Sequence, residues 1–500
     1  MADDAPAART TARPSLLRSG AFTLVASAVP LVLALVALPI LTRQLGTERL
    51  GLLSLAWAWL GYATLLDFGL GRALTRLVAG SDVGDATEGP IGAFVATAER
   101  LLLLAGAVVG MIGAAIAPWY VTSGLGVTAS LRTEAIVSAI IFALTVPAIT
   151  AASVPRAVLE ARHRFRDVNL VRLPVNLGTF GVPLLLLPFT ASLIAIAALL
   201  AALRVWAWWR YATLAHAEMP HTAHDAPARA HLRPLLRAGA WMTISNVLSP
   251  LMIVADRFVI GSLVSVNAVA LYAVPWEAVT KLWIVPGALT MVLFPAFSRA
   301  AAGPPDRLAA LHHAGVRIVT LIVVPVCAVA GLLAPWLLRL AGGESYTGAS
   351  VTVLRILAVG VAANCVAVIP FTLLQACGRA RWTATVHVLE SLPFVALLWF
   401  SVQRWGIVGA AAAWTARVLV DTALMTWRAQ DVAPLPRSII LLSASGVVVV
   451  ALACGAAATT TFSVPAMIAF AGALTIAAAL LWLARSASER QVLGTLRAQP

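Results

Sequence analysis

Long apolar stretches, separated by short polar or Pro/Gly-containing breaks, repeat along almost the whole chain. Each is about as long as the roughly 20 residues that a helix needs to cross a bilayer. Helix-length apolar runs of this kind predict fourteen membrane helices, at 19–41, 50–71, 101–118, 135–158, 168–188, 190–212, 238–262, 268–296, 314–338, 351–376, 384–403, 406–427, 438–458 and 464–484. The pattern therefore predicts an all-α polytopic membrane protein.

Composition narrows the class further. Apolar residues make up 61% of the 500 residues and charged residues only 11%, whereas soluble globular proteins carry about 25% charged residues. This balance excludes a soluble enzyme, a disordered chain and a disulfide scaffold. The four cysteines all lie inside apolar runs without metal-ligand spacing, so we expect small core residues, no metal site and no cofactor.

The formal net charge of +14 comes from 34 arginines and one lysine, Lys281. The arginines recur in short clusters between apolar runs and form no basic domain, which indicates a lipid bilayer and not a nucleic acid as the partner. If the N-terminus is cytoplasmic, 26 of the 35 basic residues fall on the inner side and five on the outer side. Cytoplasmic loops are enriched in Lys and Arg, so we expect both termini to be cytoplasmic.

The chain divides into two similar halves. Residues 16–21 (LLRSGA) match residues 235–240 (LLRAGA), and the Val154-Pro155 segment matches the Ile369-Pro370 segment at nearly the same offset. Two six-helix lobes that enter the membrane in the same direction are typical of several secondary transporters. The expected organisation is a leader at 1–17, an N-lobe at 18–212, a linker at 213–234, a C-lobe at 235–428, an additional helix pair at 437–485 and a tail at 486–500.

Charged residues at membrane depth are costly and are normally paired or functional. Asp256 and Arg257 lie midway along the seventh predicted helix, and Glu277 and Lys281 are spaced i,i+4 on the eighth. This spacing places Glu277 and Lys281 on one helix face, where they can pair. The same two helices contain Pro250, Pro275 and Pro286, which are interpreted either as hinges for alternating access or as tolerated kinks.

Other charges follow the same pattern. Arg417 and Asp421 are spaced i,i+4 on the twelfth predicted helix, while Glu390 on the eleventh has no local partner. In the N-lobe, Asp67 lies near the inner end of the second helix, followed by Arg72 and Arg76 one turn apart. Ion pairs that join helices and H⁺ or Na⁺ coupling sites at the carboxylates are both compatible with these positions.

Several segments resemble one transporter family. They are 41–51 (LTRQLGTERLG), 67–76 (DFGLGRALTR), 256–261 (DRFVIG), 272–275 (YAVP) and 294–298 (FPAFS). These segments are similar to Wzx-type flippases of the multidrug/oligosaccharidyl-lipid/polysaccharide exporter superfamily. The resemblance implies two six-helix lobes plus a helix pair, a location in the bacterial cytoplasmic membrane, and transport of polyprenyl-pyrophosphate-linked oligosaccharides. Glycosyltransferases and a polysaccharide polymerase would then be partners.

A pyrophosphate cannot cross hydrocarbon without cations around it, so such a flippase needs Arg or Lys in its central cavity. Arg257 and Lys281 are the first candidates, and Arg72, Arg76 and Arg417 are further ones. Trp276 and Trp283 are candidates for an aromatic wall that stacks on sugars or for anchors at the membrane interface.

Two alternatives remain. A cation-coupled multidrug antiporter of the same superfamily would tend to carry an acid in its first helix, and residues 19–41 contain none. A membrane glycosyltransferase or polymerase would need catalytic residues on long outer loops. Here the predicted outer loops are short and their only acids are Glu48, Glu134 and Glu344, so we expect no catalytic residues and no enzyme.

Overall fold

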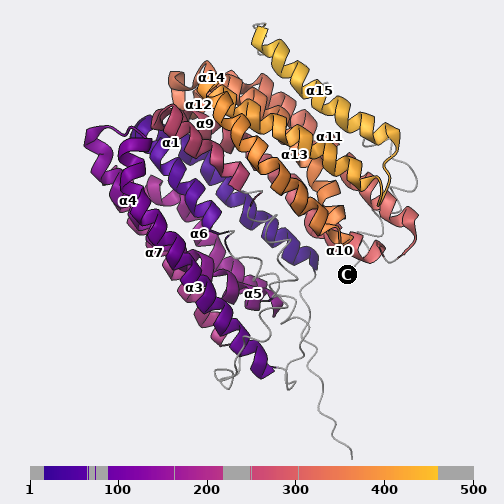
Figure 1. Cartoon of the computed structure of the whole chain (residues 1–500), viewed down its shortest axis with the longest axis horizontal. Helices are drawn as coiled ribbons and strands as arrows, with labels where there is room; N and C mark the ends of the chain where they lie inside the picture. Colours follow the sequence, from indigo (N-terminus) through magenta and orange to yellow (C-terminus); the bar gives the residue numbers. More distant parts are fainter. Residues whose placement is uncertain are drawn as a thin grey trace, which may run out of the picture.

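The computed structural model describes residues 16–64, 66, 74, 88–162, 164–217, 248, 251–301 and 303–459. In this part of the chain every regular element is a helix (Figure 1). The N-terminal half contains α1 (Leu16–Ala63), α3 (Glu88–Trp119), the π-helix η1 (Tyr120–Gly124), α4 (Ala129–Ala151), α5 (Ser153–Ala161), α6 (Phe165–Leu186) and α7 (Leu193–His216).

The C-terminal half begins with a helix at residues 251–263. It continues with α9 (Val266–Thr280), η2 (Lys281–Trp283), α10 (Ile284–Ala300), α11 (Pro305–Leu332), α12 (Ala334–Gly342), η3 (Gly343–Tyr346), α13 (Ala349–Ala376), α14 (Ala380–Ala429) and α15 (Arg437–Thr459). The helices form two groups in Figure 1, and α15 packs along α11 and α13 at the edge of the second group.

Two of the longest helices, α1 and α14, each contain two predicted spans joined at a glycine corner. The backbone of Gly46 has φ 77° and ψ 168°, and that of Gly406 has φ 56° and ψ −135°. Residues with a Cβ atom rarely adopt these angles, whereas glycine does so at little cost. The two corners therefore replace the loops expected at 42–49 and 404–405.

Nine helices in the described residues are long and apolar enough to cross a membrane. The prediction of an all-α polytopic membrane protein is confirmed. The fourteenth predicted helix, 464–484, lies outside the described residues, as does most of the expected linker, and α7 extends to His216, inside the range 213–234 expected for that linker. The helix count and the lobe boundaries therefore stay predictions.

Besides the span expected at 268–296, which the structure divides into α9, η2 and α10, two predicted helices are divided. The span expected at 135–158 is α4 followed by α5, with the break at Ala152. Pro155 explains this break, because a proline ring clashes with the carbonyl four residues earlier, which is that of Ala151. The span expected at 314–338 ends at Leu332, and α12 is a separate helix with Pro335 in its first turn, a position that proline favours.

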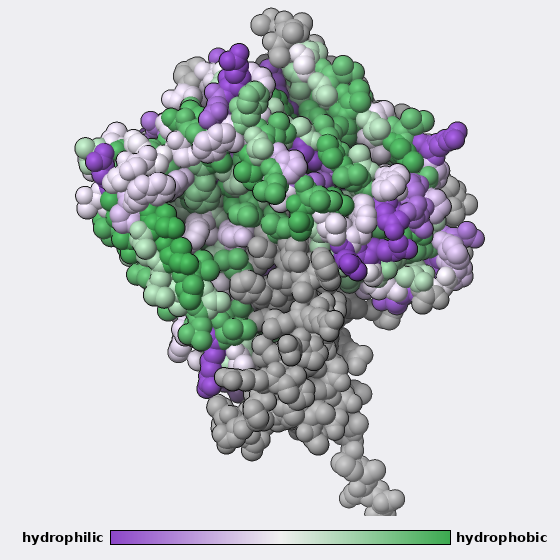
Figure 2. Space-filling view, viewed as in Figure 1, coloured by the Kyte–Doolittle hydropathy of each residue, from purple (hydrophilic) through white to green (hydrophobic). Residues whose placement is uncertain are grey.

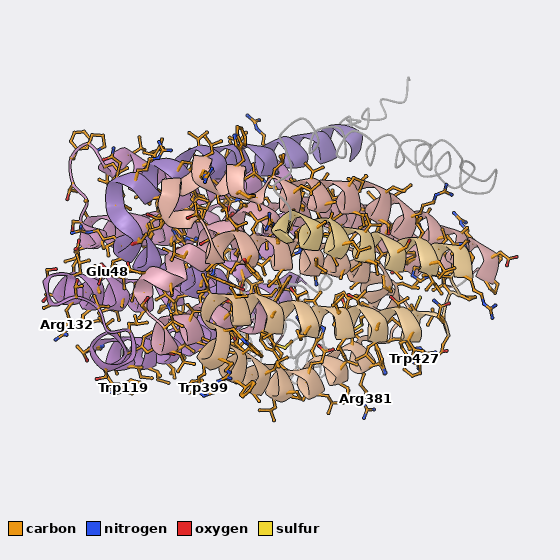
Figure 3. All side chains as sticks on the ribbon, turned by 90° about the horizontal axis from the view of Figure 1, so that it is seen from above. Glu48, Trp119, Arg132, Arg381, Trp399 and Trp427 are labelled. Atoms are coloured by element: carbon orange, nitrogen blue, oxygen red, sulfur yellow. The ribbon has the colours of Figure 1, made fainter. Side chains whose placement is uncertain are left out.

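The bundle has two distinct ends (Figure 3). Glu48, Arg132 and Trp119 lie at the end that contains the Gly46 corner, called here the Gly46 end, and Arg381 and Trp427 lie at the opposite end, called the Arg381 end. One large apolar cluster contains residues of both halves of the chain. Two smaller clusters each belong to a single half: one is formed mainly by α3, α5, α6 and α7, the other mainly by α13 and α14. The two lobes thus share a core toward the Gly46 end, while their described residues form separate cores toward the Arg381 end.

The outer surface is largely apolar, as a bilayer requires. Figure 2 shows apolar residues over the sides of the helices and polar residues mainly toward the ends. On α3 the residues Leu104, Val108, Met111, Ile112 and Ile116 are all exposed although all are apolar. A helix face of this kind in a membrane-spanning segment is adapted to lipid chains and not to water.

Candidate functional site

Two basic residues and one carboxylate form a cluster where the lobes meet. The Arg257 guanidinium donates to Glu277 Oε1 at 3.1 Å and to the main-chain oxygen of Ser54, on α1, at 3.3 Å. Lys281 Nζ donates to Glu277 Oε2 at 2.5 Å. Glu277 therefore bridges both cations, and Arg257 connects the C-lobe to the N-lobe. The contact between Glu277 and Lys281 agrees with their i,i+4 spacing.

Asp256 is held separately from this bridge. Its Oδ1 accepts a hydrogen bond from the Arg257 backbone N–H at 2.7 Å, and its Oδ2 accepts one from the Tyr272 hydroxyl at 2.5 Å. The side chain is completely buried. Since both carboxylate oxygens are already occupied, the geometry favours a role in fixing the helix at 251–263 against α9.

Lys281 is the most accessible member of the cluster. Its side chain is 28% exposed, compared with 15% for Glu277 and 6% for Arg257. The ammonium also lies 5.5 Å from the ring centroid of Phe180 on α6, a cation–π contact across the lobe interface. An anionic ligand that reaches the cluster therefore meets Lys281 first.

The helix that carries Lys281 changes its hydrogen-bond pattern at this residue. The 3₁₀ turn η2 (Lys281–Trp283) separates α9 from α10, with Pro275 before it and Pro286 after it. A 3₁₀ stretch within a long helix often marks a hinge or a strained position. The structure thus locates the irregular turn between the two prolines, at the residue that bears the accessible charge.

The aromatic residues near the cluster pack against one another. Trp276 is buried between Trp414, whose ring centroid lies 4.8 Å away, Trp283 at 6.0 Å and Tyr272 at 5.9 Å. Its ring is thus packed among other aromatic side chains inside the protein. It forms neither an exposed wall for stacking on a sugar nor an anchor at the membrane interface.

A second buried charged cluster lies between the two arms of α14. Arg417 Nε donates to Glu390 Oε2 at 3.3 Å, and His387 Nε2 lies 3.8 Å from Asp421 Oδ1. The expected pairing of Arg417 with Asp421 is thus replaced by one with Glu390, because the Gly406 corner folds the first arm back against the second. Within the described residues, Glu390 Oε1 and Asp421 Oδ1 are buried without a hydrogen-bond partner.

Comparison with known proteins identifies the family. Residues 16–301, more than half of the chain, match the model of a family described as polysaccharide biosynthesis protein. The chain belongs to this family. The resemblance inferred from the loop motifs is therefore confirmed.

Individual relatives agree with this assignment. A Shigella flexneri protein assigned as an O-antigen transporter is 28% identical over 416 residues, which is 83% of this chain and 97% of that protein. The solved structure of the lipid II flippase MurJ in an inward closed conformation has a TM-score of 0.72 and 11% identity, covering 92% of this chain and 97% of that one.

An inward-facing multidrug resistance MATE transporter of the MOP superfamily has a TM-score of 0.67 and 16% identity, covering 84% of this chain and 99% of that one. At such identities these structures show the fold alone. The relatives are transporters and flippases, and the expectation that this family member is not an enzyme is confirmed.

Some candidate residues of this family member lie outside the described residues, namely Asp67, Arg72, Arg76 and Pro250. Two charged residues were not singled out from the sequence. Arg204, which the orientation count assigns to the inner side, lies in the middle of α7, and Glu99 of α3 accepts a hydrogen bond from Trp208 Nε1 at 2.9 Å. The sequence feature that could have identified both residues is a charged side chain within or beside an apolar run.

Proposed function

We propose that the protein moves a polyprenyl-diphosphate-linked oligosaccharide across the bacterial cytoplasmic membrane for the synthesis of surface polysaccharide. The observation that carries this proposal is the Arg257–Glu277–Lys281 cluster, which holds two cations at the interface of the two lobes. Membership of the family and the match, over 83% of this chain, to a protein assigned as an O-antigen transporter support the substrate class.

The cluster has the chemistry for a diphosphate. Arg and Lys form charge-assisted hydrogen bonds with phosphate oxygens, and Lys281 is the more exposed of the two cations. In the empty protein Glu277 pairs with both cations and leaves one net positive charge, so the diphosphate takes the place of Glu277 as it binds. When the ligand leaves, Glu277 recovers both partners.

Alternating access follows from the arrangement of the lobes. They share one apolar core toward the Gly46 end, and their described residues form separate cores toward the Arg381 end. The Arg381 end carries many of the arginines that the positive-inside rule assigns to the cytoplasm. These observations support an inward-facing assignment for this conformation; in the comparison, the MATE structure is inward-facing and the MurJ structure is inward closed. Pro275 and Pro286, on either side of η2, are the hinge candidates.

The α14 cluster is our candidate for coupling to H⁺ or Na⁺. Glu390 and Asp421 are two carboxylates near a single guanidinium, Arg417, with His387 beside them. One carboxylate charge is therefore left to be balanced by a bound cation. Glycosyltransferases and a polymerase remain partners expected from the proposed substrate.

The test is complementation of a strain that lacks the gene. Arg257→Gln and Lys281→Gln are expected to abolish surface polysaccharide and to cause lipid-linked precursor to accumulate, while Lys281→Arg retains export. The matched control is Arg404→Gln, which removes one exposed arginine at the Gly406 corner. Normal export by both cluster variants, at wild-type protein level in the membrane, would contradict the proposal. Loss of drug resistance without loss of polysaccharide would favour a multidrug antiporter.

A further inference from the structure

A cavity of about 600 Å³ lies between the second arm of α1, α3, the first half of α4 and residues 258–262. It lies within the range of about 300–1,000 Å³ in which proteins bind small molecules. Because α1, α3 and α4 belong to the N-lobe and residues 258–262 to the C-lobe, the cavity spans the lobe interface. Movement of the lobes would change its shape.

The packing of α3 sets the limits of the cavity. A Cβ atom on Gly106 would lie 2.4 Å from Thr150 Oγ1, and one on Gly110 would lie 2.5 Å from the Ala143 oxygen, so α3 and α4 touch there. Toward the Gly46 end, the Tyr120 hydroxyl donates to the main-chain oxygen of Phe258 at 3.0 Å. The cavity thus occupies the stretch of α3 between a tight helix contact and a bond across the lobes.

The cavity is adjacent to the hydrocarbon of the membrane. Ile112 and Ile116 line it and are 54% and 48% exposed on the lipid-facing side of α3. Among the described residues, none that lines the cavity is charged. An occupant that enters here comes from the bilayer and is a hydrocarbon chain, because a polar group would find almost no hydrogen-bond partner on these walls.

The cavity is also close to the charged cluster along the same two helices, although none of the cluster's charged residues lines it. Phe258, which lines it, follows Arg257, and Leu53 and Leu55 flank Ser54, whose carbonyl accepts the Arg257 hydrogen bond. Ser54 lies eight residues after the Gly46 corner, which is about 12 Å along a helix. A phospholipid keeps its headgroup at the membrane surface, whereas a lipid whose headgroup binds Arg257 has that anionic headgroup at the depth of Ser54, close to the cavity.

We propose that this cavity holds the prenyl chain of the carrier lipid while its diphosphate binds at Arg257 and Lys281. The inference rests on the proposed function and adds a site for the part of the substrate that carries no charge. The protein would then recognise the carrier by two features, the diphosphate at the cluster and the hydrocarbon in the cavity, and movement of the lobes would act on both.

Photo-crosslinking tests this site. The full chain in nanodiscs of phosphatidylethanolamine and phosphatidylglycerol is irradiated with a prenyl diphosphate that carries a diazirine on its chain, and the labelled peptides are mapped by mass spectrometry. A parallel sample receives a phosphatidylglycerol with a diazirine in its acyl chain. We expect the prenyl probe to label the 109–117 segment of α3, and an excess of unlabelled prenyl diphosphate to abolish that label.

Substitutions at the cavity test whether the labelling is specific to it. Ala139 lines the cavity, so Ala139→Phe should lower labelling by roughly tenfold, as expected for a filled site, and Ala139→Leu by less. Ala115→Phe is the matched control, since Ala115 is exposed on α3 and does not line the cavity. Each variant must elute as a single folded species. If Ala139→Phe does not fold, Ala139→Leu is used as the test variant in its place.

The possible outcomes distinguish failure of the cavity proposal from failure of the proposed function. Binding of the prenyl diphosphate that depends on Arg257 but labels other segments would refute the cavity and leave the proposed function intact. Absence of any diphosphate-dependent binding would refute both. Equal labelling of the cavity by the phospholipid probe, insensitive to prenyl diphosphate, would identify a resident membrane lipid and overturn the inference.

Discussion

The charge balance at the lobe interface makes Glu277→Gln an informative substitution. In the structure this carboxylate binds both Arg257 and Lys281, so it competes with any anion for the same cations. The amide has nearly the same shape and no charge. We therefore expect the variant to bind a prenyl diphosphate more tightly than the wild type and to export glycan more slowly, because the product is released less readily.

The size of the effect follows from the contacts. A hydrogen bond to a charged group contributes about 1.5–3 kcal/mol, and Glu277 makes two, at 3.1 Å and 2.5 Å. Lys281 is 28% exposed, so solvent screening reduces its share toward about 1 kcal/mol or less. The neutral amide retains part of the remaining interaction free energy with Arg257 and Lys281. A net gain of about 1–2 kcal/mol for the ligand corresponds to about fivefold to thirtyfold tighter binding.

Equilibrium binding of a fluorescent prenyl diphosphate to the full chain in nanodiscs measures this change, and radiolabelled glycan export in cells measures the rate. The matched control is Glu160→Gln, which removes a surface carboxylate 3.6 Å from Arg156 on α5. Its affinity should equal that of the wild type. An unchanged or weaker affinity in folded Glu277→Gln protein would refute the idea that Glu277 competes with the ligand.

Two further predictions concern other parts of the fold. Arg417→Gln leaves Glu390 buried without its cation, so the free energy of unfolding measured by detergent-denaturant titration should fall by about 3–5 kcal/mol. In the Arg417→Gln/Glu390→Gln double variant the free energy of unfolding should fall less. An equal fall in both variants would argue against the ion pair. Thr47 Oγ1 lies 2.9 Å from Asn267 Oδ1 across the lobes at the Gly46 end. The Thr47→Cys/Asn267→Cys variant should therefore lose export in oxidant and regain it in reductant, with Thr47→Cys alone as the control. Undiminished export by the cross-linked protein would contradict opening at this end.

Most of the helices could be predicted from the chain, because each apolar run has to be long enough to cross the bilayer by itself. Their interruptions were harder to place. Pro155 divides one predicted helix, whereas its counterpart in the repeat, Pro370, lies inside the continuous helix α13. The same residue type has different effects because neighbouring helices decide whether the freed backbone groups find new partners.

The candidate site was predictable only where the partners are close in sequence. The i,i+4 spacing of Glu277 and Lys281 indicates their contact, since both lie on one helix face. The same argument paired Arg417 with Asp421, whereas the structure pairs Arg417 with Glu390, 27 residues away. That contact depends on the direction in which the Gly406 corner folds α14, which no local pattern specifies.

The sequence by itself determined the membrane class, the approximate spans and the presence of costly charges within them, because transfer of a segment into a bilayer depends on the composition of that segment. The tertiary structure decided which charges neutralise one another, that Trp276 packs and does not face a substrate, and where the lobes share a core. These features depend on distances between segments remote in sequence, and packing alone sets such distances. The apolar cavity near Arg257 belongs to the same category, since its walls come from N-lobe helices and from residues 258–262 of the C-lobe, which become neighbours only when the two lobes meet.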